Sequence, residues 1–236
     1  MHGQPPVVAI VQARLSSQRL PGKVLRPAAG RPMVGYLFDR LKRAPALDGI
    51  VLATSDDPAD DAVAAFAQME GIALFRGPLN DVASRILGAA DAAGATAFLR
   101  VSGDSPLLDP AIVNRAIALF RTQRPDIVSN VVKRTFPKGQ SVEIVDTETF
   151  RNAAGSFETA ADREHVTPYF YRHCDRYRIV GFERAMSAGQ VQLSVDTETD
   201  FRRFETLVGQ MTRPHWDYGL DEILDLLAAA NVDLPE

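Results

Sequence analysis

The chain has 236 residues and a formal net charge of −4, with the 46% hydrophobic and 24% charged content of an ordinary globular protein. This acidic balance argues against a general nucleic-acid coat protein, and the single cysteine, Cys174, excludes an internal disulfide framework or a cysteine-based zinc cluster. No apolar run approaches the roughly 20 residues of a membrane span, and the start of the chain lacks a signal-peptide pattern. We therefore expect a cytoplasmic protein that neither inserts into membranes nor binds nucleic acid.

Short apolar runs alternate with helical patterns through the first 130 residues. Strands are predicted at 7–11, 50–53, 72–75, 97–101 and 127–129. Helices are predicted at 33–42, 58–69, 81–93 and from Pro110 to about Phe120. In the second of these helices, the predicted buried face is Ala59, Ala62, Phe66 and Met69. Such alternation is typical of βαβ units that form a parallel sheet covered on both faces.

The alternation weakens after about residue 130. Strands are predicted at 141–145, 178–182 and 192–195, and helices at 164–173, 199–209 and 218–229. Pro168 must begin or bend the first of these helices. The pattern indicates one α/β domain over 1–236 with a mixed sheet in its C-terminal portion. Because ligands of open α/β sheets bind at the carboxyl ends of the strands, functional residues are expected just after each strand.

A cationic segment, residues 14–23, follows the first predicted strand. It contains Arg14, Arg19 and Lys23, the hydroxyls of Ser16 and Ser17, and a Pro-Gly turn. Guanidinium forks, an ammonium group and backbone N–H groups can together bind several phosphate oxygens. The spacing matches neither a Walker A loop nor a dinucleotide fingerprint. A solvated basic loop is the alternative, but the position directly after a buried strand favours phosphate binding.

Two aspartates also follow predicted strands. Asp104 lies in a Gly-Asp-Ser-Pro turn after 97–101, and Asp196 comes directly after 192–195. Carboxylates at such positions typically hold Mg²⁺ that also contacts substrate phosphates. Asp109, next to Pro110, is instead predicted to cap a helix. Asp196 could also cap a helix, as could Thr197, so the metal role for Asp196 has a structural alternative.

The later half carries a second set of candidate residues. Arg163, Glu164, His165 and Tyr169 combine charge with an aromatic ring, and Glu143 is a candidate strand-end acid for a polyol ligand. A carboxylated sugar needs a cation for its carboxylate and acceptors for its hydroxyls, which these residues can supply. The alternative is a solvated ion pair on a helix, with the aromatic ring in the core.

The motif Arg-x-Ser-Ser-x-Arg-Leu-Pro-Gly-Lys at 14–23 resembles the opening of the CMP-sugar synthetases, namely the acylneuraminate and 3-deoxy-manno-octulosonate cytidylyltransferases. The wider match is similar to a branch called spore-coat polysaccharide biosynthesis protein F. The matching blocks are 12–14, 76–77, 81–85, 100–110, 136–143, 163–169 and 195–197. They follow one another in order over most of the chain.

The resemblance implies a Rossmann-like nucleotidyltransferase fold, CTP as donor, Mg²⁺ as cofactor and a homodimer. It implies a nucleotide-binding half, 1–130, and an acceptor-binding and dimerisation half, 131–236. Asp104 and Asp196 would hold the metal and, with Arg14 and Lys23, form the catalytic set. The implied nucleotide-binding residues are Arg14, Ser16, Ser17, Arg19, Lys23, Arg76 and Arg85. The predicted acceptor-binding residues are Glu143, Arg163, Glu164, His165 and Tyr169.

The implied reaction is transfer of CMP from CTP to a sugar hydroxyl, with release of pyrophosphate, for surface polysaccharide biosynthesis. Ser102 stands where the octulosonate enzymes carry Gln, and their sugar-binding segments are not recognisable here. The acceptor is therefore expected only as an acidic keto-sugar such as a nonulosonic or octulosonic acid. Two alternatives remain open: a glycosyltransferase that uses a nucleotide-sugar, and a non-catalytic homologue that acts as a partner in the pathway.

Overall fold

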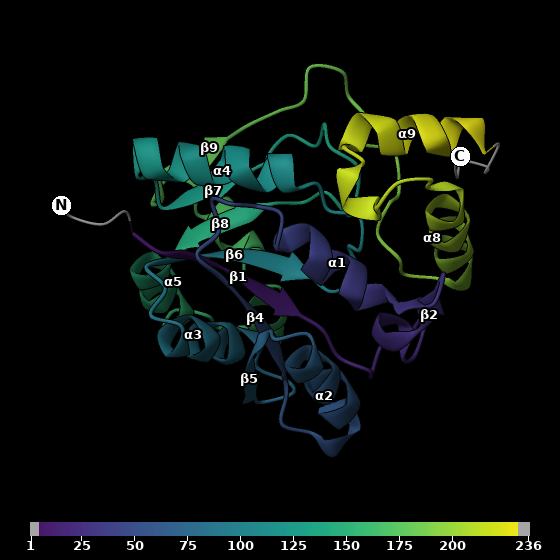
Figure 1. Ribbon diagram of the computed structural model, residues 1–236. Helices are drawn as coiled ribbons and strands as arrows, with labels where there is room; N and C mark the ends of the chain where they lie inside the picture. The colour runs from purple at the N-terminus through teal and green to yellow at the C-terminus, as the bar shows by residue number, and fades with distance from the viewer. Residues whose placement is uncertain (1–4, 231–236) are drawn as a thin grey trace.

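The computed structural model describes residues 5–230, so residues 1–4 and 231–236 of the predicted unit lie outside the described part. Its centre is a seven-stranded sheet with the order β5-β4-β1-β6-β8-β7-β9 (Figure 1). The strands are β1 (Val7–Gln12), β4 (Gly49–Ser55), β5 (Ala73–Gly77), β6 (Ala97–Ser102), β7 (Ile127–Ser129), β8 (Glu143–Asp146) and β9 (Ile179–Gly181). A two-residue pair, β2 (Pro27–Ala28) and β3 (Arg31–Pro32), stands apart from this sheet.

Strand direction divides the sheet into two parts. The strands β5, β4, β1 and β6 run parallel, whereas β8 is antiparallel to both β6 and β7, and β9 is parallel to β7. The predicted α/β fold, mostly parallel with a mixed C-terminal portion, is confirmed. Gln12 at the end of β1 lies opposite Ser102 at the end of β6, so the segments that follow these two strands leave the sheet side by side.

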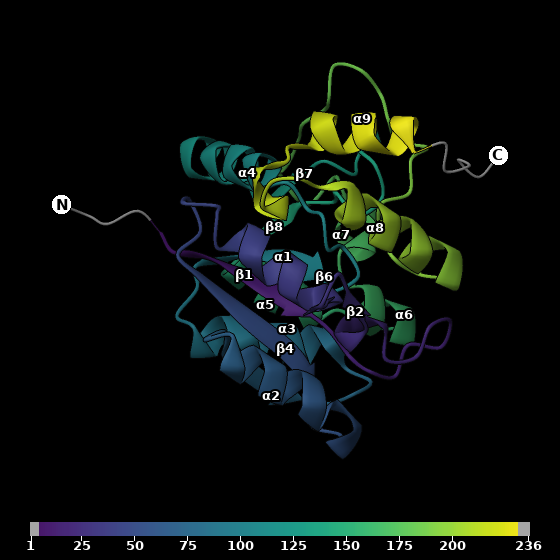
Figure 2. The same cartoon turned by 45° about the vertical axis from the view of Figure 1, so that its right-hand side comes forward.

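Helices cover both faces of the sheet (Figures 1 and 2). The α-helices are α1 (Met33–Leu41), α2 (Asp61–Met69), α3 (Val82–Ala92), α4 (Pro110–Gln123), α5 (Thr147–Ala154), α6 (Ala160–His165), α7 (Pro168–Arg172), α8 (Glu198–Gln210) and α9 (Leu220–Ala229). Short 3-10 helices are η1 (Lys23–Leu25), η2 (Pro58–Asp60) and η3 (His215–Asp217). Side chains of α1, α2, α4, α8 and α9 form one apolar cluster, and those of α3, α5 and α7 form the other. Within residues 5–230, no helix has the length and apolar character of a membrane span.

The apolar run of β1 is explained by its place in the middle of this sheet. Val7, Ala9 and Val11 pack into one apolar cluster, while Val8 and Ile10 pack into the other. A strand covered on both faces has no solvent-exposed side and therefore no polar alternation. The first side chain of β1 that is not buried is Gln12, at the carboxyl end of the strand. Polar segments that could contact a ligand are therefore expected to begin there.

The buried face of α2 differs from the prediction. The helix buries Val63, Phe66 and Ala67, whereas Ala59 is exposed and Met69 is 79% exposed. Ala62 is exposed as well. At 100° per residue, Val63 and Ala67 lie to one side of Phe66 and Ala62 and Met69 lie to the other, so the helix is rotated about its axis relative to the predicted face.

Two other predicted elements differ in the C-terminal portion. The predicted helix 164–173 is divided into α6 and α7, because Val166 has a φ of +54°. Pro168 begins α7, where its missing N–H costs no hydrogen bond. The predicted strand 192–195 is absent from the sheet and forms only an isolated bridge between Gln192 and Lys138. It runs instead against the segment around Gly139, with two backbone N–H groups bonded to the Lys138 carbonyl.

Gly139 determines how closely this bridge can form. Its φ is +90°, and a Cβ placed on it would lie 2.5 Å from the Ser194 backbone nitrogen. Gly139→Ala is therefore expected to lower the free energy of unfolding by about 2 kcal/mol or more, through backbone strain and a clash with the main chain. Urea unfolding followed by circular dichroism measures this change, with Gly209→Ala as control, because a Cβ at Gly209 meets nothing within 4 Å. Equal stability of the two variants would contradict the prediction.

Candidate active site

The cationic segment 14–23 folds back beside the carboxyl end of β1. Gly22 adopts a left-handed conformation with a φ of +71°, and its N–H donates to the Leu15 carbonyl at 2.9 Å. Glycine suits this position because the conformation is costly for residues with a Cβ. The 3-10 helix η1 begins directly afterwards and buries Lys23, which is 7% exposed. Lys23 Nζ donates to the Val195 carbonyl at 2.6 Å, so the first strand's loop contacts the C-terminal portion.

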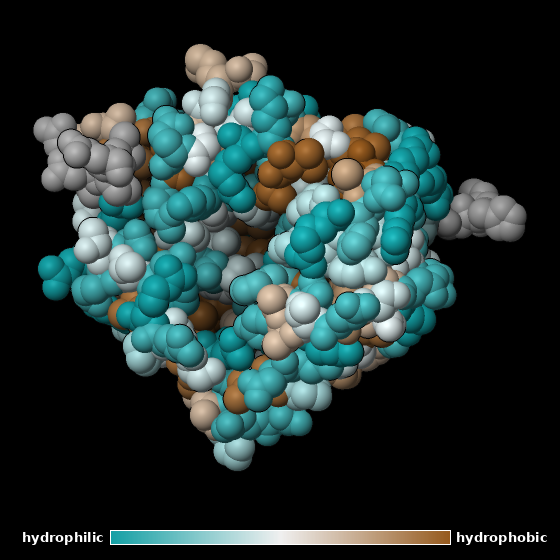
Figure 3. All heavy atoms as spheres, turned by 180° about the vertical axis from the view of Figure 1, so that it is seen from behind, coloured by the Kyte–Doolittle hydropathy of each residue, from teal (hydrophilic) through white to brown (hydrophobic). Residues whose placement is uncertain are grey.

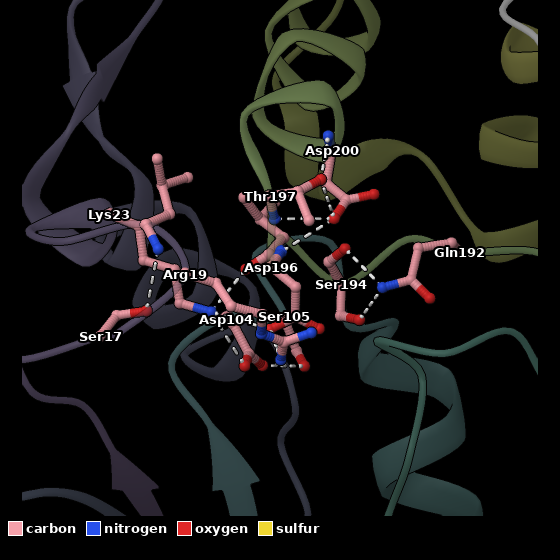
Figure 4. A network of polar contacts seen from close by, with 12 residues as sticks. Ser17, Arg19, Lys23, Asp104, Ser105, Gln192, Ser194, Asp196, Thr197 and Asp200 are labelled. Atoms are coloured by element: carbon pink, nitrogen blue, oxygen red, sulfur yellow. Dashed lines mark hydrogen bonds and ion pairs between the residues drawn. The ribbon is translucent and has the colours of Figure 1, made fainter.

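Asp104 and Asp196, which are distant in the sequence, meet at this lysine (Figure 4). Lys23 Nζ lies 3.1 Å from Asp196 Oδ1 and 3.4 Å from Asp104 Oδ2. Arg19 Nη2 also contacts Asp196 Oδ1, at 2.8 Å. The main chain holds the two acids together, because the Val195 N–H donates to the Asp104 carbonyl at 2.8 Å. The two carboxylates therefore face one small volume that is bordered by cations.

The capping alternative for Asp196 does not apply. Thr197 is the N-cap of α8, and it forms a capping box with Asp200. The side chain of Asp196 is thereby left free to face Lys23 and Arg19. By contrast, Asp109 caps α4 by accepting from the Ala111 N–H at 2.8 Å, as predicted.

A first cavity of about 860 Å³ extends from these acids along the cationic segment. Pockets for small ligands usually measure roughly 300 to 1,000 Å³, so its size suits a nucleoside triphosphate. Of the predicted site residues, it is lined by Arg14, Ser16, Ser17, Arg19, Lys23, Arg85, Asp104, Glu164, His165 and Asp196. The structure thus brings residues predicted for phosphates and metal together with Glu164 and His165, which were predicted for the acceptor, and all these roles remain predictions.

An ion pair and a hydrogen bond hold two arginines of this cavity in place. Arg14 Nη2 pairs with Glu164 Oε1 at 3.0 Å, which connects the cationic segment to α6. Arg85 is 1% exposed, and its Nη1 donates to the Pro78 carbonyl at 2.7 Å. Burial lowers the pKa of Arg85, but an arginine keeps its charge at neutral pH even so.

A second cavity of about 380 Å³ adjoins the first. Arg100, Ser102 and Asp104 line both, so the two cavities meet at the end of β6. Glu143 lines the second cavity, as its predicted acceptor role requires. Seen from behind, the molecule has a hollowed surface with hydrophilic residues around the hollows (Figure 3).

Three predicted site residues line neither cavity. Arg76 pairs with Asp61 at 2.6 Å, and Arg163 pairs with Asp81 at 3.4 Å. Tyr169 is 6% exposed and packs in the apolar cluster under α7. Local carboxylates direct the two arginines away from the cavities, and the ring of Tyr169 lies on the core side of its helix. The nucleotide role of Arg76 and the acceptor roles of Arg163 and Tyr169 therefore remain predictions that the two cavities do not support.

Sequence reasoning missed several residues that line the cavities. Gln12 and Arg100 lie at or near the ends of β1 and β6, and Tyr171 lies on α7 beside the second cavity. The available signal was a polar side chain in an otherwise apolar strand. The other unpredicted polar residues are Gln18, Asn80, Ser102, Ser105, Arg134, Lys138, Ser141, Thr167 and Ser194.

Arg163→Ala is expected to leave both the CTP dissociation constant and the turnover number within about twofold of wild type. Its partner Asp81 is also the N-cap of α3, and the pair is partly exposed, so the loss of stability should be at most about 1 kcal/mol. Titration calorimetry and a pyrophosphate-release assay measure both quantities. A tenfold loss of turnover would contradict the prediction and would show that Arg163 contributes to the reaction.

Few side chains at this site could coordinate a metal ion. Within residues 5–230, no group of three or more His, Cys, Asp or Glu side chains is arranged to hold a metal ion. Two aspartates alone are typical of Mg²⁺ sites that use substrate phosphate oxygens and water as further ligands. The site therefore suits a metal that arrives with a triphosphate.

Residues 8–228 match the family model described as cytidylyltransferase. The spore coat polysaccharide biosynthesis protein SpsF of Bacillus subtilis is 29% identical over 229 residues, which cover 94% of this chain and 93% of that protein. The 3-deoxy-manno-octulosonate cytidylyltransferase of Geobacter sulfurreducens is 39% identical over 117 residues, 48% of this chain and 44% of that enzyme.

A solved cytidylyltransferase structure from Leptospira borgpetersenii superposes with a TM-score of 0.92 at 23% identity, and covers 98% of both chains. At that identity the likeness establishes the fold. The family match over nearly the whole chain establishes the class of enzyme, a nucleotidyltransferase. This chain belongs to the cytidylyltransferase family.

Proposed function

We propose that the enzyme transfers CMP from CTP to a hydroxyl of an acidic keto-sugar and releases pyrophosphate, for the synthesis of a surface polysaccharide. The observation that carries the proposal is the convergence of Asp104 and Asp196 on Lys23, where a cavity of triphosphate size opens into a second, smaller one. The sugar oxygen forms a bond to the α-phosphorus as the bond to pyrophosphate breaks. The hydroxyl proton passes to water in the same reaction.

The cationic segment is proposed to bind the β- and γ-phosphates. Arg14 and Arg19 are partly exposed in the first cavity, and Lys23 is buried at its inner end. Phosphoryl-type transfer depends mainly on positioning and on stabilising charge. These cations would stabilise the negative charge that grows on the leaving pyrophosphate. Ser16 and Ser17 supply hydroxyl donors to the same region.

Members of this family generally use a divalent metal ion, and we propose Mg²⁺ here. Asp104 and Asp196 suit it, because one ammonium group contacts both carboxylates and hard oxygen ligands are what Mg²⁺ prefers. When bound, Mg²⁺ would supply charge neutralisation at the α-phosphate. Lys23 and Arg19 contact these aspartates, so binding of the metal with CTP would free both cations for phosphate oxygens.

The second cavity is proposed to hold the acceptor. Glu143 and the hydroxyls of Ser105 and Ser141 can bond to sugar hydroxyls. Arg134 and Lys138 add positive charge, which suits an anionic sugar. The names of the relatives support this class, because SpsF is named for spore-coat polysaccharide and the Geobacter enzyme for an octulosonate.

We also propose a cytoplasmic homodimer with much of its contact in the C-terminal half, as the resemblance implies. Analytical ultracentrifugation measures the mass in solution. A monomer at micromolar concentration would contradict the dimer.

The test of function is incubation with CTP, Mg²⁺ and a panel of nonulosonic and octulosonic acids, followed by pyrophosphate assay and product mass. CMP-sugar and equimolar pyrophosphate are expected with at least one acid. A glycosyltransferase would instead release a nucleoside diphosphate from a nucleotide-sugar. No product with any acid would contradict the proposed acceptor class.

A further inference from the structure

Arg100 lies at the point where the two cavities meet. It lies in β6, two residues before Ser102, and its side chain is 24% exposed. Its Nε donates to Gln12 Oε1 at 2.9 Å. Its Nη1 faces Glu143 Oε2 at 3.4 Å and Thr167 Oγ1 at 3.5 Å. Three segments of the chain therefore fix the plane of this guanidinium.

A buried network holds Glu143 in turn. Glu143 is 7% exposed and accepts from the Tyr171 hydroxyl at 2.5 Å and from Thr167 Oγ1 at 3.2 Å. The Tyr171 oxygen also lies 2.8 Å from Ser129 Oγ. Burial and the charge of Glu143 raise the pKa of Tyr171, so the phenol stays protonated and donates to the carboxylate. Each oxygen of Glu143 thus accepts a protein hydrogen bond that holds the carboxylate beside Arg100, and its further lone pairs remain able to accept from a ligand.

One nitrogen of the guanidinium remains available. Among residues 5–230, Arg100 Nη2 has no hydrogen-bond partner, although Nε and Nη1 are both engaged. The side chain borders both cavities, so its free N–H groups can bond to a ligand at their junction. A guanidinium fixed on one edge binds an oxyanion at low entropic cost.

The chemistry of the proposed acceptor indicates which oxyanion Arg100 would bind. In the cyclic form of a 2-keto sugar acid, the anomeric hydroxyl and the carboxylate are attached to the same carbon. If that hydroxyl attacks the α-phosphorus beside Asp104, the carboxylate must lie at the junction as well. Arg134 and Lys138, in contrast, line only the second cavity and would meet groups further from the reacting carbon.

We propose that Arg100 binds the carboxylate of the acceptor and determines the preference for acidic over neutral sugars. Tyr171 and Glu143 are positioning residues that hold Arg100 in place. The proposal rests on the proposed function, since it assumes that an acidic keto-sugar enters the second cavity.

The test compares an acidic acceptor found in the panel with its uncharged primary amide. Arg100→Met is expected to lower kcat/KM for the acid by about a hundredfold, as loss of a charge-assisted hydrogen bond can, and to change the amide by less than threefold. The CTP dissociation constant without acceptor should stay within threefold of wild type. Arg151→Met is the control, because Arg151 pairs with Asp91 on the surface and lines neither cavity.

Several outcomes would overturn the assignment. An equal loss for acid and amide, or a comparable loss of CTP affinity, would place Arg100 on the phosphates. A kcat/KM that stays at the wild-type value for both acid and amide would remove Arg100 from the acceptor site while leaving the proposed function intact. If wild type transfers CMP to no acid of the panel, the proposed function fails, and this assignment fails with it.

Tyr171→Phe tests the positioning role separately. Loss of the hydroxyl should raise KM for the acid several-fold and narrow the preference for acid over amide, with kcat changed less. A purely structural tyrosine would lower the melting temperature and leave that preference unchanged, which contradicts the role. Tyr177→Phe is the matched control, since Tyr177 packs beside Phe170 and lines neither cavity.

Discussion

Asp104→Asn is expected to lower kcat at least about a hundredfold at saturating CTP and Mg²⁺, with the fold retained. The substitution preserves size and removes the charge that a hard cation requires. The backbone carbonyl that accepts from the Val195 N–H is unaffected, so the contact between the two segments should persist. Pyrophosphate release gives the rate, and near-ultraviolet circular dichroism checks the fold.

The control and a second measurement make this prediction specific to the metal site. Asp61→Asn removes an exposed carboxylate that pairs with Arg76 outside both cavities, and it should be nearly neutral. Mn²⁺ binding in the presence of CTP, followed by electron paramagnetic resonance, should weaken in Asp104→Asn and in Asp196→Asn alike. Near-normal activity of Asp104→Asn would exclude it as a metal ligand.

Lys23→Ala is expected to weaken CTP binding about tenfold or more and to lower kcat as well. The ammonium lies at the inner end of the first cavity, where the leaving pyrophosphate would gain charge, so part of its effect should appear only in the transition state. CMP should bind nearly as well as to wild type, because it has no β- or γ-phosphate. Arg14→Ala should show the same pattern with a smaller effect, because the charge of Arg14 is already partly balanced by its ion pair with Glu164.

Titration calorimetry measures the dissociation constants for CTP and for CMP separately. Lys133→Ala is the matched control, since Lys133 pairs with Glu183 at the surface and lines neither cavity. Lys23→Ala also leaves Asp104 and Asp196 facing each other without the ammonium, so its melting temperature should fall and recover partly when Mg²⁺ is added. Equal losses of affinity for CTP and CMP would place Lys23 away from the β- and γ-phosphates.

Much of the first cavity could be predicted from the sequence. Arg14, Lys23 and Asp104 each follow a buried strand closely, and the carboxyl ends of neighbouring parallel strands meet at one edge of a sheet. The apolar runs define those strands because a strand covered on both faces needs apolar residues throughout. Position relative to a strand was therefore enough to bring these residues together.

The second cavity could be predicted less well because its elements do not follow this rule. The antiparallel strand β8 returns Glu143 to the side of Arg100, at a register that no local pattern specifies. Tyr171 rather than Tyr169 borders the second cavity, since the break at Val166 resets the faces of the following helix. The break depends on a backbone conformation that periodicity cannot predict.

The sequence by itself determined the α/β alternation, the phosphate-type cationic segment and the two candidate metal ligands, because local pattern controls strand burial and strand ends. Only the tertiary structure decided which charged side chains face the cavities. The sequence singles out Arg163, but it pairs with Asp81 and lines neither cavity. Gln12 and Glu143 instead hold Arg100 where the two cavities meet. Such choices depend on partners that are distant in the sequence, and these partners become neighbours only when the sheet has formed.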